Sequence, residues 1–135
     1  MNLKILILSS FMAFSVAFGG SSCQDILRQN VVKDFLATTS DDNFSLKQTE
    51  CDKNGLSLKY SINDIILSYN EEQQKNLAEN ARWNIFHAYC DKDGTLKDFR
   101  NSSFFVHYRY INSKGGGFSM KIDENLCQRV KHGSN

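Results

Sequence analysis

The sequence predicts an α+β fold in which helices pack on one face of an antiparallel sheet. Two pairs of segments alternate apolar and polar residues, which is typical of half-buried strands, and a turn sequence joins each pair. A segment with apolar residues at helical spacing precedes each pair. The predicted order is therefore helix, strand, strand, helix, strand, strand. Residues 20–135 show no linker and no internal repeat, so we expect a single domain stabilised by disulfides.

Residues 1–19 have the organisation of a secretory signal peptide. Lys4 supplies a positive start, residues 5–18 are apolar and uncharged, and small residues follow at the predicted cleavage site. The apolar run is too short to span a membrane. We expect a periplasmic or secreted protein whose mature chain begins near Gly20.

Two other interpretations of the N-terminus stay open. The apolar run could form a buried N-terminal helix, or Cys23 could carry the lipid of a lipoprotein. Gly20 stands three places before that cysteine, where lipoprotein signals usually have a leucine-like residue. Lipidation would also leave Cys51 without a cysteine partner.

The charge balance disfavours one class of partner. The chain has 16 basic and 15 acidic residues, and removal of Lys4 with the signal peptide leaves 15 of each. Nucleic-acid binding normally requires a clustered basic excess, so we expect no nucleic-acid partner. No second long apolar run is present, and no transmembrane segment is expected in the mature chain.

Four cysteines, Cys23, Cys51, Cys90 and Cys127, predict two disulfides, because an even count in an exported chain indicates bridges. Their wide spacing does not resemble a zinc or C-x-x-C redox site. The predicted fold selects one of the three possible pairings. A first helix antiparallel to the first strand places Cys23 beside Cys51, and the last hairpin returns Cys127 to the end of the second helix at Cys90.

The first half is predicted to contain a helix over 23–36 and strands over 44–51 and 56–63. Asn54 and Gly55 between the strands indicate a tight hairpin turn. The apolar positions of the first strand change parity along its length. A β-bulge near Lys47 and Gln48 would reconcile them.

The second half is predicted to begin with a helix over 71–89, capped by a Ser68 and Glu71 capping box. A polar turn over 91–94, a short helical piece over 95–101 and strands over 103–111 and 118–127 follow. Glycines 115–117 form the turn between these strands. The tail over 128–135 is expected to be frayed.

The segments Tyr89-Cys90, VHYRY at 106–110, the glycine turn and a final strand ending in cysteine follow one another in order. This layout over residues 35–127 resembles a small family of exported bacterial proteins, the quorum-sensing-regulated virulence factors. The resemblance implies a compact exported α+β domain. Cys23 and Cys51 lie outside the pattern, so their pairing depends on the residues alone.

No familiar catalytic or cofactor motif is present. The three histidines, His87, His107 and His132, have no second ligand or base at a telling spacing. Asp91 and Asp93 lack the later ligands of a calcium loop. With every cysteine bridged no thiol nucleophile is left, so no catalytic residue, metal or cofactor is predicted.

Strand parity places Lys59, His107, Arg109 and Lys121 on the outer face of the sheet. Such a basic patch predicts binding of an acidic partner protein or an anionic envelope polymer. The alternative is an ordinary solvated sheet face.

The leading functional prediction is an exported, non-enzymatic bacterial protein that acts by protein contact, as an envelope accessory protein, a virulence-associated factor or an inhibitor. The alternative is a small periplasmic hydrolase whose site combines Asp64, Glu71 and Asp123. Convergence of two of these carboxylates in one cleft would favour the hydrolase. The oligomeric state is not predicted.

Overall fold

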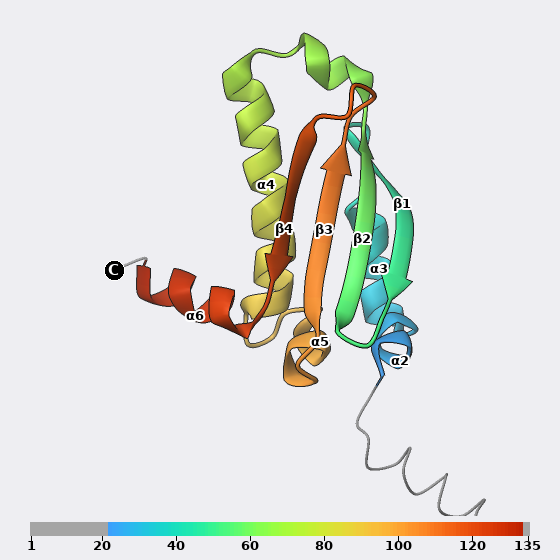
Figure 1. The fold of residues 1–135 in the computed structure, drawn as a ribbon, viewed down its shortest axis with the longest axis vertical. Helices are drawn as coiled ribbons and strands as arrows, with labels where there is room; N and C mark the ends of the chain where they lie inside the picture. Colours follow the sequence, from blue (N-terminus) through green and yellow to red (C-terminus); the bar gives the residue numbers. More distant parts are fainter. Residues whose placement is uncertain (1–21, 134–135) are drawn as a thin grey trace, which may run out of the picture.

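The computed structural model describes residues 22–133, which form a four-stranded sheet with helices around it (Figure 1). The predicted signal peptide lies outside the described residues. The elements in chain order are α2 (Cys23–Leu27), α3 (Asn30–Thr38), β1 (Phe44–Cys51), β2 (Gly55–Ile62), η1 (Asp64–Ser68), α4 (Glu71–Cys90), α5 (Lys97–Asn101), β3 (Phe105–Ile111), β4 (Gly117–Ile122) and α6 (Glu124–Gly133).

The strands lie in the order β1-β2-β3-β4. The two predicted hairpins are antiparallel, but β2 and β3 pair in parallel, so the prediction of a fully antiparallel sheet is wrong at its centre. The connection from β2 to β3 is long and contains α4 and α5. It returns the chain to the end at which β2 begins, so Gly55 pairs with Phe105 and Ser61 with Ile111.

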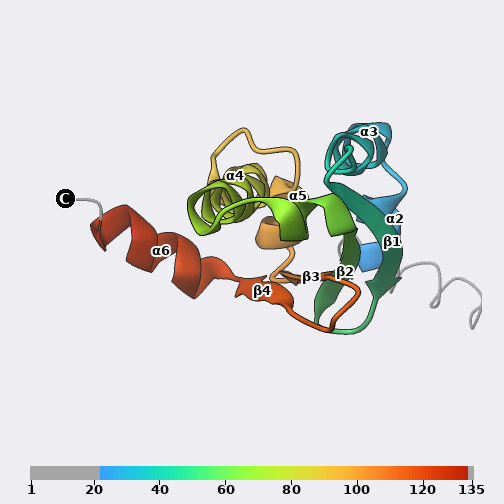
Figure 2. The same cartoon turned by 90° about the horizontal axis from the view of Figure 1, so that it is seen from above.

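Helices α3 and α4 lie on the same side of the sheet, as the view from above shows (Figure 2). The register of β1 against β2 shifts between Leu46 and Gln48, which confirms the predicted bulge. The shift allows Phe44, near the start of β1, and Cys51, at its end, both to reach the helix side of the sheet.

A row of aromatic rings crosses the inner face of the sheet. Tyr60 and Tyr110 stack at 4.2 Å between ring centroids, and Tyr110 and Phe118 stack at 4.5 Å. Phe44 meets Tyr110 edge-on at 4.9 Å. Each such pair contributes about 0.5–1.5 kcal/mol beyond the burial of its area. A hydrogen bond of 2.7 Å joins the hydroxyls of Tyr60 and Thr39, so the row also fastens the end of α3 to the sheet.

Two predicted helix boundaries differ in the structure. The helix predicted over 23–36 is divided into α2 and α3 at Arg28 and Gln29. The cap of α4 is not Ser68, which ends η1. Asn70 and Gln73 form the capping box instead, with the Gln73 amide donating to the Asn70 side chain at 2.8 Å.

Helix α6 replaces the predicted end of the last strand and the predicted frayed tail as far as residue 133; the rest of the tail lies outside the described residues. β4 ends at Ile122, and the Asp123 carboxylate accepts a hydrogen bond of 2.9 Å from the backbone amide of Leu126. This is the usual contact of an N-cap residue. Leu126, Cys127 and Val130 then recur at helical spacing, which gives α6 one apolar side.

The structure contains the disulfides Cys23–Cys51 and Cys90–Cys127, the same two pairs that the sequence predicts. The first joins the start of α2 to the end of β1. The second joins the end of α4 to the first turns of α6, not to a strand as expected. Both bonds therefore attach a helix to the body of the domain.

Replacing Cys90 and Cys127 together by Ser should lower the free energy of unfolding by about 3–4 kcal/mol, because the unfolded chain gains conformational entropy when the bond no longer closes a loop. The double replacement of Cys23 and Cys51 should cost less. The two loops have similar spacings, 37 and 28 residues, but fully buried Ile26 still holds α2 in place by packing. Urea unfolding followed by circular dichroism measures both variants. An equal or larger loss for the Cys23 and Cys51 variant would contradict this ranking.

Candidate functional site

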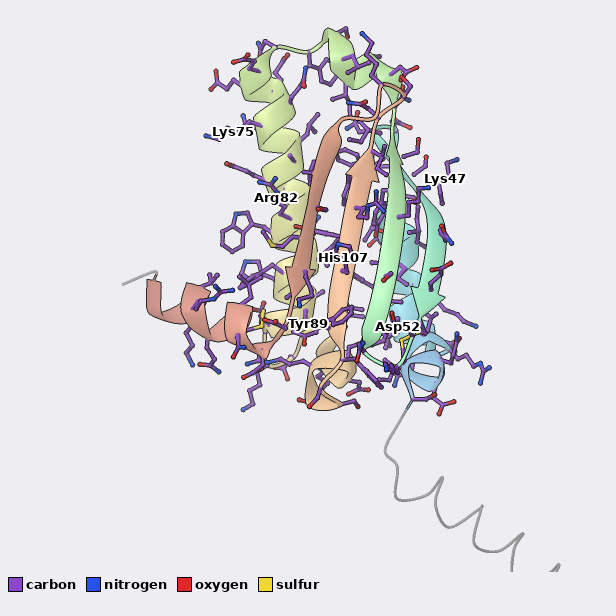
Figure 3. The ribbon with its side chains drawn as sticks, viewed as in Figure 1. Lys47, Asp52, Lys75, Arg82, Tyr89 and His107 are labelled. Atoms are coloured by element: carbon purple, nitrogen blue, oxygen red, sulfur yellow. A yellow bond between two sulfur atoms is a disulfide. The ribbon has the colours of Figure 1, made fainter. Side chains whose placement is uncertain are left out.

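The four predicted basic residues come together on the outer face of the sheet. Lys59 lies opposite Arg109, and His107 lies opposite Lys121 on neighbouring strands. The lysines and the arginine are exposed, and His107 is half-buried on β3 (Figure 3). None of the ion pairs among the described residues involves any of the four. That this face binds a partner stays a prediction.

Two of the three carboxylates of the hydrolase alternative, Asp64 and Asp123, do not converge in one cleft. The third, Glu71, is the exposed first residue of α4. Asp64 accepts a hydrogen bond of 2.7 Å from Ser113 in the β3–β4 turn, at the end of β3. Asp123 follows Ile122, which pairs with Val106 near the start of β3. A strand rises about 3.3 Å per residue, so roughly 20 Å separates the two carboxylates along β3. Both also have structural roles, one holding the turn and the other capping α6.

A groove between α4 and α6 is the main feature that sequence reasoning missed. It consists of two adjoining cavities of about 890 and 330 Å³ that share the walls Trp83, Phe86 and Val130. Met120 of β4 and Leu126 of α6 also line the smaller cavity. The groove therefore lies beside the β4 edge of the sheet, where α6 extends away from the domain (Figure 1).

Trp83 is the most conspicuous residue of this groove. It is the single tryptophan of the chain, and 47% of its surface is exposed. Phe86 meets its ring edge-on and His87 stacks on it, each at 5.3 Å between centroids. A large exposed ring held by its neighbours beside other apolar side chains is typical of a binding surface.

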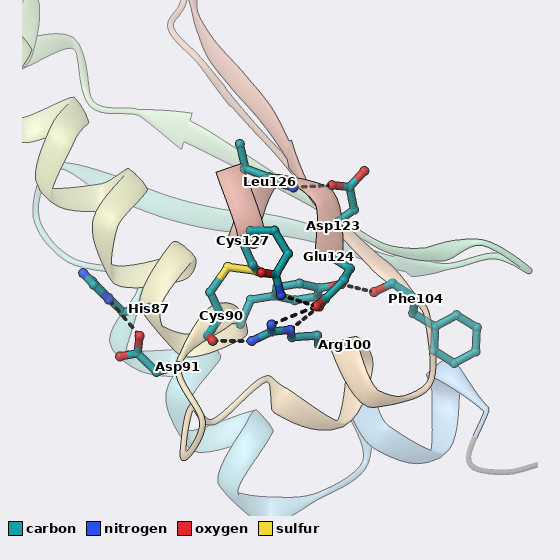
Figure 4. The surroundings of a disulfide bond; sticks show 11 residues. His87, Cys90, Asp91, Arg100, Phe104, Asp123, Glu124, Leu126 and Cys127 are labelled. Carbon is teal, nitrogen blue, oxygen red and sulfur yellow. Dashed lines mark hydrogen bonds and ion pairs between the residues drawn. A yellow bond between two sulfur atoms is a disulfide. The ribbon is translucent and has the colours of Figure 1, made fainter. Parts of the chain in front are cut away.

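One end of the groove is fixed by a cluster around the Cys90–Cys127 disulfide (Figure 4). Arg100 of α5 donates to the carbonyl of Cys90 and to the carboxylate of Glu124, with 3.0 Å between Nη2 and Oε1. Three helices, α4, α5 and α6, are thus joined at one point. The cluster sets the direction in which α6 leaves the domain.

The electrostatics of this cluster favour the ion pair. Hydrogen bonds from Arg100 and then from Gln128 lower the pKa of the Glu124 carboxyl to about 2. The same contact raises the pKa of the Arg100 guanidinium. Nearby, burial raises the pKa of Tyr89 to about 12, and its hydroxyl donates to the carbonyl of Phe104 at 2.8 Å. The pair is therefore charged throughout the physiological range.

The rim of the groove near the disulfide carries unpaired positive charge. Exposed Lys92 and Lys97 line the larger cavity, and neither takes part in an ion pair among the described residues. Asp91 on the same rim is engaged with His87 at 3.1 Å. The disulfide end of the groove therefore suits an acidic group.

The groove combines an apolar inner cavity with a charged outer cavity near the disulfide. No cluster of three His, Cys, Asp or Glu side chains able to hold a metal occurs in the described part of the chain. The signal that could have revealed the groove was the N-cap Asp123 followed by Leu126 and Val130 at helical spacing. Reading these residues as strand and tail hid one wall of the groove.

Replacing Glu124 by Gln should reduce stability by about 0.2–1 kcal/mol, because the Glu124 side chain is exposed and solvent screens the pair. The lowered pKa means that the contribution is complete above the unfolded pKa of about 4.3 and disappears as the pH falls through about 2. Urea unfolding at several pH values should show wild type and variant converging in this window. Glu72→Gln, which removes the same charge elsewhere, is the control, and a gap that persists at pH 2 would contradict the assignment.

No protein-family model and no curated protein sequence matches the chain, so the resemblance to the quorum-sensing-regulated family stays a prediction. A comparison with solved structures finds two partial matches. The pilotin EpsS of the Vibrio vulnificus type 2 secretion system is 12% identical, with a TM-score of 0.47 over 73% of this chain and 88% of that chain. PA3611 of Pseudomonas aeruginosa, assigned as a secreted protein, is 13% identical, with a TM-score of 0.45 over 80% and 99%. At these values neither likeness says what this chain does.

Proposed function

We propose that this chain is an exported protein that binds a partner protein without catalysing a reaction. The partner inserts an amphipathic helix into the groove between α4 and α6. The observation that carries the proposal is the half-exposed Trp83 on the wall shared by the two cavities of the groove, the smaller of which is apolar.

The shape of the groove favours a helix as its occupant. Its walls are two helices, and its apolar residues come from α4, β4 and α6. A third helix can lie between two others and bury residues at positions i, i+3, i+4 and i+7. Burial of the Trp83 ring would supply a large share of the affinity, since indole rings dominate such contacts.

Charge complementarity defines one end of the bound helix. Lys92 and Lys97 mark the disulfide end of the groove. Acidic residues at the corresponding end of the partner helix would orient it and speed its association.

Export is supported by the two disulfides, because such bonds form and persist in oxidising compartments. Within residues 22–133, none of the helices has the length and apolarity needed to cross a membrane. The predicted signal peptide agrees with a periplasmic or secreted location. Membership of the quorum-sensing-regulated family also stays a proposal.

The basic sheet face offers a second candidate surface. Lys59 and Arg109 lie side by side on the parallel strands β2 and β3. Like charges in this arrangement repel, which lowers stability unless an anion binds them. The sheet face would suit an acidic partner protein or an anionic envelope polymer.

A peptide titration tests the groove. The probe is a tryptophan-free amphipathic peptide of about 18 residues, with leucines at i, i+3, i+4 and i+7 and glutamates at one end. Binding should shift the Trp83 emission to shorter wavelength and reduce its quenching by acrylamide. A peptide of the same composition with its leucines spread around the helix should not bind.

Matched variants locate the contact. Val130→Asp in the groove should weaken binding at least about tenfold, or ~1.4 kcal/mol. Val31→Asp on α3, at a position 60% exposed, should leave it unchanged. Loss of binding in Arg109→Glu but not in Val130→Asp would assign the contact to the sheet face and contradict the groove.

A further inference from the structure

Arg82 occupies the inner end of the groove, about 12 Å along α4 from Cys90 at 1.5 Å per residue. It lines the smaller cavity with Trp83 and Met120. Its guanidinium lies 4.9 Å from the centre of the Phe118 ring. Figure 3 shows where Arg82 leaves α4.

Two polar atoms at this end of the groove lack a hydrogen bond of normal geometry within the described part of the chain, although Arg82 as a whole is half-buried. Its Nε is buried and has no hydrogen-bond partner there, and the same holds for the hydroxyl of Tyr108. Glu79, three residues earlier on α4, lines the same cavity and pairs with Lys75 at 4.0 Å. None of the ion pairs includes Arg82.

This arrangement is costly in the free protein. A buried donor without a partner lowers the stability of the fold, and more so if its group is charged. The contact with the Phe118 ring offsets part of the cost. Burial raises the pKa of Tyr108 to about 12, and the charge of Arg82, followed by the close approach of its guanidinium to the Tyr108 hydroxyl, acts against that rise. The tyrosine therefore remains a neutral hydroxyl and cannot neutralise Arg82.

We infer that the helix bound in the groove carries a side-chain carboxylate that pairs with Arg82. This inference rests on the proposed function. A carboxylate is the group that a guanidinium binds with two parallel hydrogen bonds, and the low polarity of the groove strengthens the pair. The carboxylate lies within the apolar face of the partner helix, about two turns from the acidic end that faces Lys92 and Lys97.

The groove therefore discriminates among apolar helices. A fully apolar face would cover Arg82 without a partner, which is unfavourable. A face with one Asp or Glu at the matching position would satisfy it. Arg82 thus acts as a specificity residue for the partner, whereas Trp83 supplies general apolar contact.

A double-mutant cycle tests the inference. Two C-terminally amidated peptides differ only by Glu or Gln at the position facing Arg82, and each is titrated against wild type and Arg82→Gln. The exchange from Glu to Gln should weaken binding to wild type about tenfold or more and to Arg82→Gln less than twofold. Arg82→Lys, which keeps the charge but loses the paired hydrogen bonds, should show an intermediate preference.

The outcomes separate the two proposals. If both peptides bind wild type equally well, the inferred carboxylate is refuted, whereas the proposed binding of a helix in the groove is retained. If the Glu-to-Gln exchange has the same effect in Arg82→Gln as in wild type, the contact with Arg82 is wrong. If neither peptide binds any variant, and thermal unfolding shows that all of them fold, both proposals fall.

Discussion

The Cys90–Cys127 disulfide is the constraint on which the outer part of this structure depends. Helix α6 follows the edge strand β4 and does not pack across a face of the sheet (Figure 1). The disulfide and the Arg100–Glu124 pair hold its first turns against the end of α4. From there α6 extends beyond the β4 edge, which leaves Trp83 partly uncovered and creates the groove (Figures 1 and 2). A helix packed along its whole length would close this surface.

The body of the domain supplies the rigid support. The stacked rings of Tyr60, Tyr110 and Phe118 tie β2, β3 and β4 together beneath the helices. Phe118 then continues this row to the guanidinium of Arg82. The Arg82 end of the groove is therefore in contact with the aromatic row on the inner face of the sheet. A bound carboxylate would meet a cation that the core holds in place, which reduces the ordering cost of binding.

The sequence predicts the local pairings well and the tertiary choices less well. The alternation of apolar and polar residues and the Asn54-Gly55 turn are local signals, so the hairpins and the bulge beside Gln48 could be predicted. The parallel pairing of β2 with β3 depends on the path of α4, which no local pattern specifies. The sequence FSMKID, residues 118–123, fits a strand. Extending that strand to Cys127 concealed the role of Asp123 as the N-cap of α6. The groove could not be predicted because the exposure of Trp83 depends on where α6 leaves the domain.

The most direct measurement is site-specific photo-crosslinking in the source cell. A photoreactive residue replaces Val130 in the groove, Val31 on α3 or Arg109 on the sheet face, and the crosslinked products are identified by mass spectrometry. We expect one discrete adduct from position 130, mapping to an amphipathic helical segment with a carboxylate in its apolar face, and no such adduct from position 31. An adduct from position 109 alone, or none from position 130 above the level at position 31, would contradict it.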